Sequence, residues 1–340
     1  MNQSKKYAVW NNKGGVGKTS LSFIIATQYA RDYPEQEVVV VDMCPQANLS
    51  EILLGGADGS KVVTVLIEQN KTVGAYINKR ISSPHKRLSI QDELAHLVQP
   101  STYNKQIPSN LYLACGDPNL EIQAQVINQI GAQDLPVDCW RNVRLWLRDF
   151  IEGCDSKFKN PIFFIDCNPS FSAYTELAMA AANRLIIPCT SDGSSARAID
   201  NIASLLYGID QSHNIMNYAN KAKKHEIRLP LIHTVVFNRS TQYNKKASKA
   251  FDAMNKEIIN RMNRLQEKNP SCFFSHEDPK HLFETVPDTH SAAIVCSHNG
   301  MPLCDLKSGS YDVHDIPAQV NSEPLERYQN VMQQLVSRLS

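Results

Sequence analysis

The chain has 340 residues, enough for one large domain or two modest ones, and its composition is that of a globular protein with a sizeable core. Its 35 Lys and Arg residues nearly balance its 34 Asp and Glu residues, which excludes a strongly basic or acidic protein. The balance is uneven, because residues 221–268 contain twelve Lys or Arg residues against four Asp or Glu residues. This asymmetry predicts a basic face directed at an acidic partner.

The cysteines and the N-terminal segment indicate the cellular compartment. Nine cysteines are scattered without a C-x-x-C pair, so we expect small buried residues rather than a zinc or redox motif. The polar start Met1–Lys6 is not typical of a secretory signal, and no apolar stretch approaches the length of a membrane span. We therefore expect a cytoplasmic protein with reduced thiols and no membrane partner.

The first predicted element is a strand, a glycine-rich turn and a helix. The apolar run Tyr7–Trp10 precedes Asn12–Ser20, and the apolar run Leu21–Ala26 follows. Glycines let the backbone turn tightly and present N–H groups to an anion, and the start of a helix favours negative charge. The arrangement indicates a phosphate-binding loop, or P-loop. We predict that nucleotide is bound by Lys13, Gly14, Gly15, Val16, Gly17, Lys18, Thr19 and Ser20.

Two features of this loop bear on its chemistry. Lys18 is placed to reach the β- and γ-phosphates of ATP, and the Thr19 hydroxyl is placed to ligate Mg²⁺. The strict P-loop pattern has glycine at the position of Asn12, and a second lysine, Lys13, follows that exception. Later in the chain, the apolar run Pro161–Asp166 predicts a buried strand with a carboxylate at its tip, which in P-loop proteins holds a water on Mg²⁺. We predict that Thr19 and, through water, Asp166 bind the metal.

Strands and helices alternate along the rest of the chain. We predict strands at 37–42, 111–114, 161–166, 184–188 and 231–237, and helices at 72–81, 91–98, 119–130, 139–151, 173–183, 194–207, 245–267, 288–296 and 323–339. This alternation predicts an α/β protein with a P-loop NTPase fold, in which helices cover both faces of a mostly parallel twisted sheet. We expect a single domain over residues 1–340, with a helical insertion region at 58–160 and a C-terminal helix at 323–339.

The motifs resemble those of one family. Lys13–Thr19, Lys-Gly-Gly-Val-Gly-Lys-Thr, resembles the deviant Walker A loop of the ParA/MinD ATPases. Asp42–Asn48 is similar to their switch I, D-x-D-P-Q-x-N, and Asp166–Ser170 to their switch II, D-C-P-P-S. Asn238 lies where the family has an adenine-recognising Asn at a strand end, and Val286–Asp288 resembles its I-P-R segment. The resemblance therefore implies that Asn238, Pro287 and Asp288 bind nucleotide.

The resemblance also implies a function. It implies a homodimer that forms on ATP binding, in which Lys13 reaches across the interface to the partner's phosphates and Lys13, Lys18 and Asp42 have catalytic roles. A lysine suits the first role, because it supplies a mobile point charge between two facing triphosphates. Such proteins position or partition plasmids, chromosomes or protein assemblies. They bind DNA nonspecifically and respond to a ParB-like or cargo-adaptor protein that stimulates hydrolysis.

Three departures from the family pattern qualify this expectation. Cys44 replaces the second Asp of switch I, and a neutral thiol positions water or Mg²⁺ poorly, so we predict slow ATP hydrolysis. Asn168 replaces a proline of switch II, which alters loop stiffness. The segment after Pro287 lacks the arginine that family members often use to touch DNA. We predict phosphate contacts, or alternatively a merely solvated basic face, for Lys221, Lys223, Lys224, Lys245, Lys246 and Lys249.

Other functions stay open at this stage. Cys44 is also compatible with a hydrolysis-deficient, ATP-locked scaffold or regulatory dimer. A MinD-like membrane-associated positioner would need a basic amphipathic C-terminal helix. The stripe Leu325, Tyr328, Met332, Leu335 and Leu339 favours a docked core helix instead, because the polar face carries few cations. A related electron carrier would need cysteines arranged to share a cluster across the dimer, which the sequence does not indicate.

Overall fold

The computed structural model describes residues 4–209, 217–240, 242–243, 246–247, 249–288 and 291–340. Its centre is a seven-stranded sheet of order β3-β2-β4-β1-β5-β6-β9, in which every neighbouring pair is parallel. The strands are β1 (Lys5–Val9), β2 (Val38–Met43), β3 (Leu111–Ala114), β4 (Ile162–Cys167), β5 (Arg184–Cys189), β6 (Leu231–Ser240) and β9 (Phe283–Pro287). Two small hairpins lie outside it: β7 (Gln242–Tyr243) with β8 (Lys246–Ala247), and β10 (Gly309–Val313) with β11 (Ile316–Val320).

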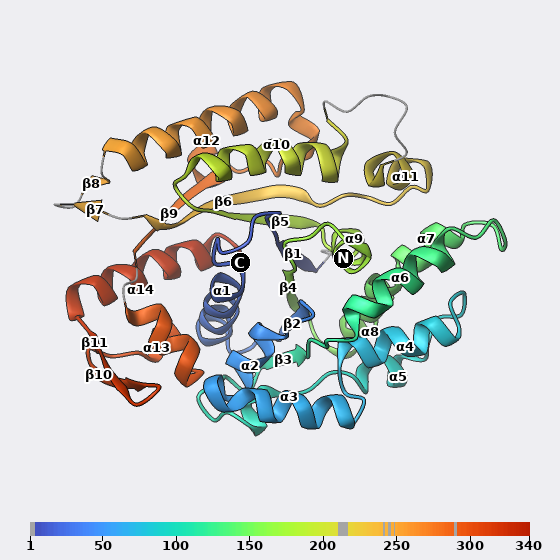
Figure 1. Ribbon diagram of the computed structural model, residues 1–340, viewed down its shortest axis with the longest axis horizontal. Helices are drawn as coiled ribbons and strands as arrows, with labels where there is room; N and C mark the ends of the chain where they lie inside the picture. The colour runs from blue at the N-terminus through green and yellow to red at the C-terminus, as the bar shows by residue number, and fades with distance from the viewer. Residues whose placement is uncertain (1–3, 210–216, 241, 244–245, 248, 289–290) are drawn as a thin grey trace.

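Helices cover both faces of the sheet (Figure 1). One face packs against α1 (Lys18–Asp32), α2 (Asn48–Gly55), α3 (Gly59–Glu68), α13 (Ser291–Asn299) and α14 (Ser322–Ser337). The other carries α4 (Val73–Ser82), α5 (Ile90–Leu94), α6 (Leu120–Gly131), α7 (Cys139–Arg144), α8 (Trp146–Lys157), α9 (Ala173–Ala181), α10 (Gly193–Tyr207), α11 (Tyr218–Lys224) and α12 (Lys249–Lys268). The predicted fold class is confirmed.

The β2 strand shows why its residues form a central strand. Val38 and Val40 belong to the core under one face, whereas Val39 and Val41 belong to the core under the other. A continuous β-branched run therefore buries its apolar surface on both faces of the sheet, as a parallel sheet requires. From β1 the chain first adds strands on one side, β2, β3 and β4, and then on the other, β5, β6 and β9. In such sheets ligands bind at the carboxyl ends of the strands where the direction of addition changes.

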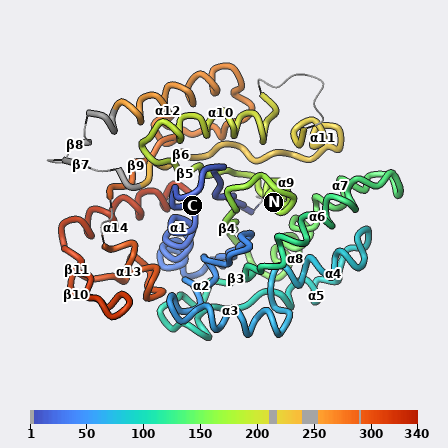
Figure 2. The backbone as a smooth tube through the Cα atoms, in the orientation of Figure 1, coloured from blue at the N-terminus to red at the C-terminus, as the bar shows by residue number. Residues whose placement is uncertain are grey.

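The region between residues 58 and 160 gathers at one end of the sheet (Figure 2). It is mostly helical, but it also contributes β3, which pairs with β2 in the main sheet. Because one sheet takes strands from residues 5 to 287 and α14 packs on it, we propose that residues 1–340 form one domain. The C-terminal helix α14 packs on α1 and β9, and Leu325, Tyr328, Met332, Leu335 and Leu339 are all buried. The C-terminal helix α14 is therefore a docked core helix, as its apolar stripe predicted.

Three predicted helices differ from the structure. The helix predicted at 91–98 ends at Leu94, because the backbone of Val98 instead pairs with Leu113 of β3. The helix predicted at 139–151 is broken at Leu145, whose φ of −89° and ψ of −1° end α7. The helix predicted from residue 245 begins at Lys249, after the β7–β8 hairpin. None of the described helices is long and apolar enough to cross a membrane.

Candidate functional site

The glycine-rich loop joins β1 to α1 at the carboxyl edge of the sheet. Gly15 and Gly17 have φ values of +74° and +83°, which favour glycine. A Cβ on Gly17 would lie 2.1 Å from Asn238 Nδ2, so no side chain fits there without a shift. Gly17 caps α1 without a side-chain hydrogen bond, and the first turn of α1 contains no acidic residue. The first amides of a 15-residue helix therefore face no competing carboxylate of their own turn, which suits a bound phosphate.

Lys18 is buried under this loop. Its Nζ donates hydrogen bonds to the backbone oxygens of Asn11, at 3.1 Å, and Lys13, at 2.7 Å. Burial lowers the pKa of Lys18, although Asp166 nearby opposes that effect. The two carbonyls fix the ammonium at the base of the loop, and the role of Lys18 as a phosphate ligand stays a prediction.

The predicted metal ligands lie in contact. Thr19 Oγ1 donates to Asp166 Oδ2 at 2.9 Å, and Ser22 Oγ donates to Asp166 Oδ1 at the same distance. Asp166 lies near the end of β4 and is almost completely buried. A hydroxyl and a carboxylate are hard oxygen donors of the kind that Mg²⁺ prefers. The residues present therefore fit the predicted cation.

Asp42 lies beside Asp166, because the two residues are paired across β2 and β4. Its Oδ2 accepts hydrogen bonds from the Ser50 backbone N–H at 3.0 Å and the Ser50 hydroxyl at 2.7 Å, and its Oδ1 accepts one from the Cys44 N–H at 3.1 Å. Burial raises the pKa of both carboxyl groups, and the charge of Asp42 raises that of Asp166 further. Two adjacent buried carboxylates favour a cation between or beside them.

The two switch-loop departures from the family pattern touch each other. Asn168 Nδ2 lies 3.7 Å from Cys44 Sγ, and Asn168 Oδ1 accepts from the Ser170 N–H and hydroxyl at 3.0 and 2.9 Å. The Trp10 indole N–H donates to Asn168 O at 3.1 Å. Burial, helped by the Asp42 charge, raises the pKa of the Cys44 thiol to about 11. The thiol is therefore neutral at physiological pH.

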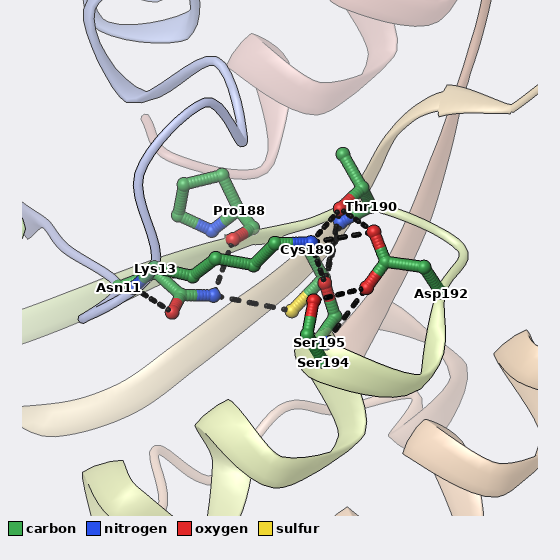
Figure 3. Close-up of polar contacts among 8 residues, drawn as sticks. All are labelled: Asn11, Lys13, Pro188, Cys189, Thr190, Asp192, Ser194 and Ser195. Carbon is green, nitrogen blue, oxygen red and sulfur yellow. Dashed lines mark hydrogen bonds and ion pairs between the residues drawn. The ribbon is translucent and has the colours of Figure 1, made fainter.

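The second loop lysine, Lys13, has a partner within its own chain (Figure 3). Its Nζ lies 2.5 Å from Asp192 Oδ2 and 2.9 Å from Thr190 Oγ1, with Ser195 Oγ at 3.4 Å. Asp192 is the N-cap of α10 and accepts from the Ser195 N–H. Burial opposes ionisation of Asp192, but the hydrogen bonds from Lys13, Ser194 and Ser195 outweigh it and hold its pKa well below the usual range. We name this group, Lys13 with Thr190, Asp192 and Ser195, the Lys13 latch.

The residues implied for the base lie next to the loop. Asn238, near the end of β6, donates from Nδ2 to Val16 O at 3.1 Å. Pro287 ends β9 and pairs with Ser240, so β6 and β9 finish side by side, and Asp288 follows directly. Ser20 lines a neighbouring cavity of about 400 Å³ between α1, α2 and α13. The structure thus brings the predicted loop, carboxylate and base residues to one edge of the sheet.

The predicted DNA-binding lysines are placed only in part. Lys221, Lys223 and Lys224 form the last turn of α11, and Lys223 and Lys224 are exposed. Lys245 lies outside the described residues, and the side chains of Lys246 and Lys249 are not described. A common face for the six lysines therefore stays a prediction.

Several residues of the site were not predicted from the sequence. They are Ser22, Ser50, Asn11, Thr190, Asp192 and Ser195. Asp192 carried a usable signal, since an Asp between a strand end and a helix start is a favoured N-cap. Ser50 carried none, because its contact with Asp42 depends on the turn made by residues 43–47.

Known proteins are similar to this chain in sequence and in fold. Residues 4–222 match the AAA domain family. The chromosome partitioning protein ParA of Myxococcus xanthus (strain DK1622) is 28% identical over 202 residues, covering 59% of this chain and 56% of the relative. The chain thus aligns with just over half the length of that relative.

Two solved structures share the fold. An ATP complex of a McdA variant from Cyanothece has a TM-score of 0.60 at 13% identity, covering 99% of this chain and 98% of that one. Cobyrinic acid a,c-diamide synthase from Mycobacterium smegmatis, with bound ADP and magnesium, has a TM-score of 0.51 at 16% identity, covering 88% and 93%. At these identities the likeness concerns the fold alone.

The parallel sheet, the glycine-rich loop and the Thr19–Asp166 pair together define a P-loop NTPase fold. The family match spans well over half of the chain. The chain therefore belongs to the AAA domain family, and its fold and motifs are similar to those of ParA-like ATPases, as the resemblance implied.

Proposed function

We propose that this chain is an ATP-dependent molecular switch that dimerises on binding ATP, hydrolyses it, and thereby positions or partitions DNA or another cargo. The observation that carries the proposal is the loop geometry. Lys18 and the Thr19–Asp166 pair stand at one end of the loop, and a second lysine, Lys13, stands at the other. One lysine is enough to bind a nucleotide within a monomer, so the second requires a separate explanation.

Each residue then has a task. The α1 amides and Lys18 bind the phosphates, and Asn238, Pro287 and Asp288 contact the base. Thr19 and Asp166 would hold Mg²⁺, whose charge offsets that of the phosphates. Asp42, fixed by Ser50, orients the attacking water. Lys13 leaves Asp192 and reaches the phosphates of the partner subunit when the dimer forms.

Analytical size-exclusion chromatography with light scattering tests this proposal. We expect the wild type to be monomeric with ADP and dimeric with Mg²⁺ and a non-hydrolysable ATP analogue. Lys13→Gln should bind nucleotide and stay monomeric, whereas Lys280→Gln, an exposed lysine in a distant turn, should behave as the wild type. A wild type that is dimeric without nucleotide, or monomeric in every state, would overturn the proposal.

One observation favours a second candidate, an ATP-locked scaffold that does not turn over. The neutral Cys44 thiol lies beside Asp42, where it supplies no negative charge to a metal or to water. Steady-state phosphate release, with and without DNA, separates the two. Turnover that DNA or a partner protein raises supports a cycling ATPase, and dimerisation without turnover supports the scaffold.

The proposed partners are a second copy of the chain, nonspecific DNA, and a ParB-like or cargo-adaptor protein that stimulates hydrolysis. DNA binding through the basic 221–268 region should tighten as salt is lowered, because each phosphate contact releases counterions. DNA binding that is absent or independent of salt contradicts that part. We do not propose a MinD-like membrane positioner, because the apolar stripe of α14 is buried in the core.

A further inference from the structure

A second cavity lies at the opposite edge of the sheet from the candidate nucleotide site. Its volume is about 600 Å³, within the usual range for small-ligand sites of roughly 300–1,000 Å³. Lys6, Asn183 and Leu231 line it where β1, β5 and β6 begin. It therefore lies at the amino ends of strands whose carboxyl ends lead to the P-loop and the Lys13 latch.

Part of this cavity wall is apolar and fixed. Ala181 and Ala182 come from the end of α9, Leu229 and Pro230 from the segment before β6, and Tyr207 from the end of α10. The Tyr207 hydroxyl donates to Pro230 O at 2.8 Å, which ties the ring to the facing segment. Apolar walls with a small number of convergent polar groups are typical of ligand sites.

The polar groups of the cavity carry unbalanced positive charge. Arg148 donates from Nε, at 3.0 Å, and from Nη2 to the single carbonyl Ala180 O, which fixes its guanidinium. Arg228 also lines the cavity and is exposed. Within the described residues, neither arginine has a carboxylate at ion-pair distance.

Comparable arginines nearby are paired. Arg80 lies 2.5 Å from Asp149, and Arg144 lies 2.5 Å from Glu176. These pairs follow the general rule that a buried cation acquires a counter-ion. Arg148 is less buried than these two arginines and has no such ion pair within the described residues; burial lowers its pKa, and the charge of Glu152 opposes that effect.

The acidic groups around the cavity are already engaged. Glu152 lines the wall, but its carboxylate lies 2.8 Å from Arg87. The Lys6 ammonium lies 3.1 Å from Asp155, so that cation is balanced. Arg87 also pairs with Glu93, so the charge of Glu152 is shared between Arg87 and Arg148. Arg228 is therefore the cation of this wall that, within the described residues, has no carboxylate at ion-pair distance, and Arg148 is balanced in part.

We propose that this cavity binds an organic anion: a carboxylate, sulfonate or phosphate group carried on an apolar body. The anionic group lies against Arg148 and Arg228, and the apolar body lies against Pro230 and Tyr207. Arginine suits this contact, because its planar fork matches the oxygens of such anions. The site is separate from the candidate nucleotide site, and its occupation does not depend on the function proposed above.

Fluorescence titration with 8-anilinonaphthalene-1-sulfonate, which carries a sulfonate on an aromatic body, tests the proposal. We expect saturable binding to the full-length wild type and a dissociation constant raised about tenfold in Arg228→Gln, as for loss of one charge-assisted hydrogen bond. Arg148→Met should weaken binding at least as much. Arg264→Gln, which removes an exposed arginine of α12 that does not line this cavity, is the matched control and should bind as the wild type.

An uncharged probe of the same shape, N-phenyl-1-naphthylamine, isolates the contribution of charge, and it should bind equally to the wild type and both arginine variants. Competition by benzoate and by phenyl phosphate then distinguishes a carboxylate from a phosphate ligand. Because Arg148→Met removes a contact to α9, circular dichroism checks its fold, and Arg228→Gln tests the proposal independently. An unchanged dissociation constant in Arg228→Gln, or equal weakening of both probes, would overturn the proposal.

Discussion

The two edges of the sheet differ in how fully their charged groups are partnered. At the carboxyl edge each charged group of the candidate site has a partner in the chain: Lys13 has Asp192, Lys18 has two carbonyls, and Asp166 has two hydroxyls. At the amino edge Arg148 has the Ala180 carbonyl, whereas Arg228 has no carboxylate at ion-pair distance within the described residues. The first edge must exchange internal partners to bind a ligand, whereas the second has positive charge that a ligand completes. The comparison predicts that substitutions act differently at the two edges.

The largest effect is expected from Lys18→Met. This change removes the ammonium that the loop carbonyls fix beside Asp166, and ATP turnover should fall on the order of 10²–10³-fold. Phosphate release under saturating ATP measures it. Lys280→Met, at an exposed distant position, should leave turnover unchanged. Undiminished turnover in Lys18→Met would show that the candidate site at the carboxyl edge of the sheet does not catalyse ATP hydrolysis.

Next in size is Cys44→Asp. Turnover should rise on the order of 10²-fold, because a carboxylate replaces a neutral thiol beside Asp42. Without Mg²⁺ and ATP the same change should lower the melting temperature, because a third carboxylate joins two buried ones. Cys44→Ser, which adds no charge, should do neither.

The contact between Cys44 and Asn168 allows a sharper version of that experiment. Asn168→Asp also places a carboxylate beside the thiol, and a double-mutant cycle with Cys44→Asp should be non-additive in turnover. Additive effects would show that the two departures from the family pattern act independently. Equal turnover in Cys44→Asp and the wild type would contradict the prediction that Cys44 slows hydrolysis.

A glycine pair tests the loop backbone alone. Gly17→Ala should lower the free energy of unfolding by about 2 kcal/mol, because φ is +83° and the new methyl meets the Asn238 amide. Gly14→Ala, where no atom lies within 4 Å of the new methyl, should change it by less than about 0.5 kcal/mol. Urea unfolding without nucleotide measures both. Equal effects would contradict the close approach of Asn238.

The smallest expected change is in Asp192→Asn. The ion pair is partly exposed, so its loss should lower the free energy of unfolding by less than about 1 kcal/mol. Since the pKa of Asp192 is depressed in the folded state, this contribution is fully present above the unfolded value of about 3.9, declines below it, and is lost as pH falls through the lower folded pKa. The difference between variant and wild type should therefore disappear in acid.

The same variant also tests the Lys13 latch through assembly. Because Lys13 no longer has to leave a carboxylate, the ATP concentration for half-maximal dimerisation should fall several-fold. Ser204→Ala, on the same helix α10 but away from the latch, serves as a control for general effects on that helix. A higher ATP requirement in Asp192→Asn would mean that the carboxylate assists Lys13 instead of restraining it.

The sequence predicted what local patterns determine. Apolar runs placed β1, β2, β4 and β5 within two residues, because a strand buried on both faces is apolar throughout. The strand β9 was missed, because Phe283–Pro287 is short and mixes polar residues at the sheet edge. The β10–β11 hairpin was missed as well. Its turn places His314 and Asp315 at positive φ, without the glycine that usually marks such a turn.

The candidate site was likewise predictable only where its residues are close together in the chain. The nucleotide loop was predictable, because its glycines, Lys18 and Thr19 are consecutive in the chain. The partner of Lys13 was not, because Asp192 is 179 residues away and meets it only after β1 and β5 pair. The cavity at the amino edge gave no signal, since its lining residues come from six elements that are far apart in the chain and from the segments between them.

The Lys13 latch makes assembly in the proposed cycle depend on the concentration of the protein itself. In the proposed cycle an internal carboxylate competes with a phosphate that only a second copy of the chain can bring. The pairing of β1 with β5 holds Asp192 beside Lys13 in every free subunit. Free subunits at low abundance therefore keep Lys13 on Asp192 even when ATP is plentiful. In the proposed cycle assembly would then respond to the local concentration of copies as well as to nucleotide, and the protein would act as a sensor of its own density.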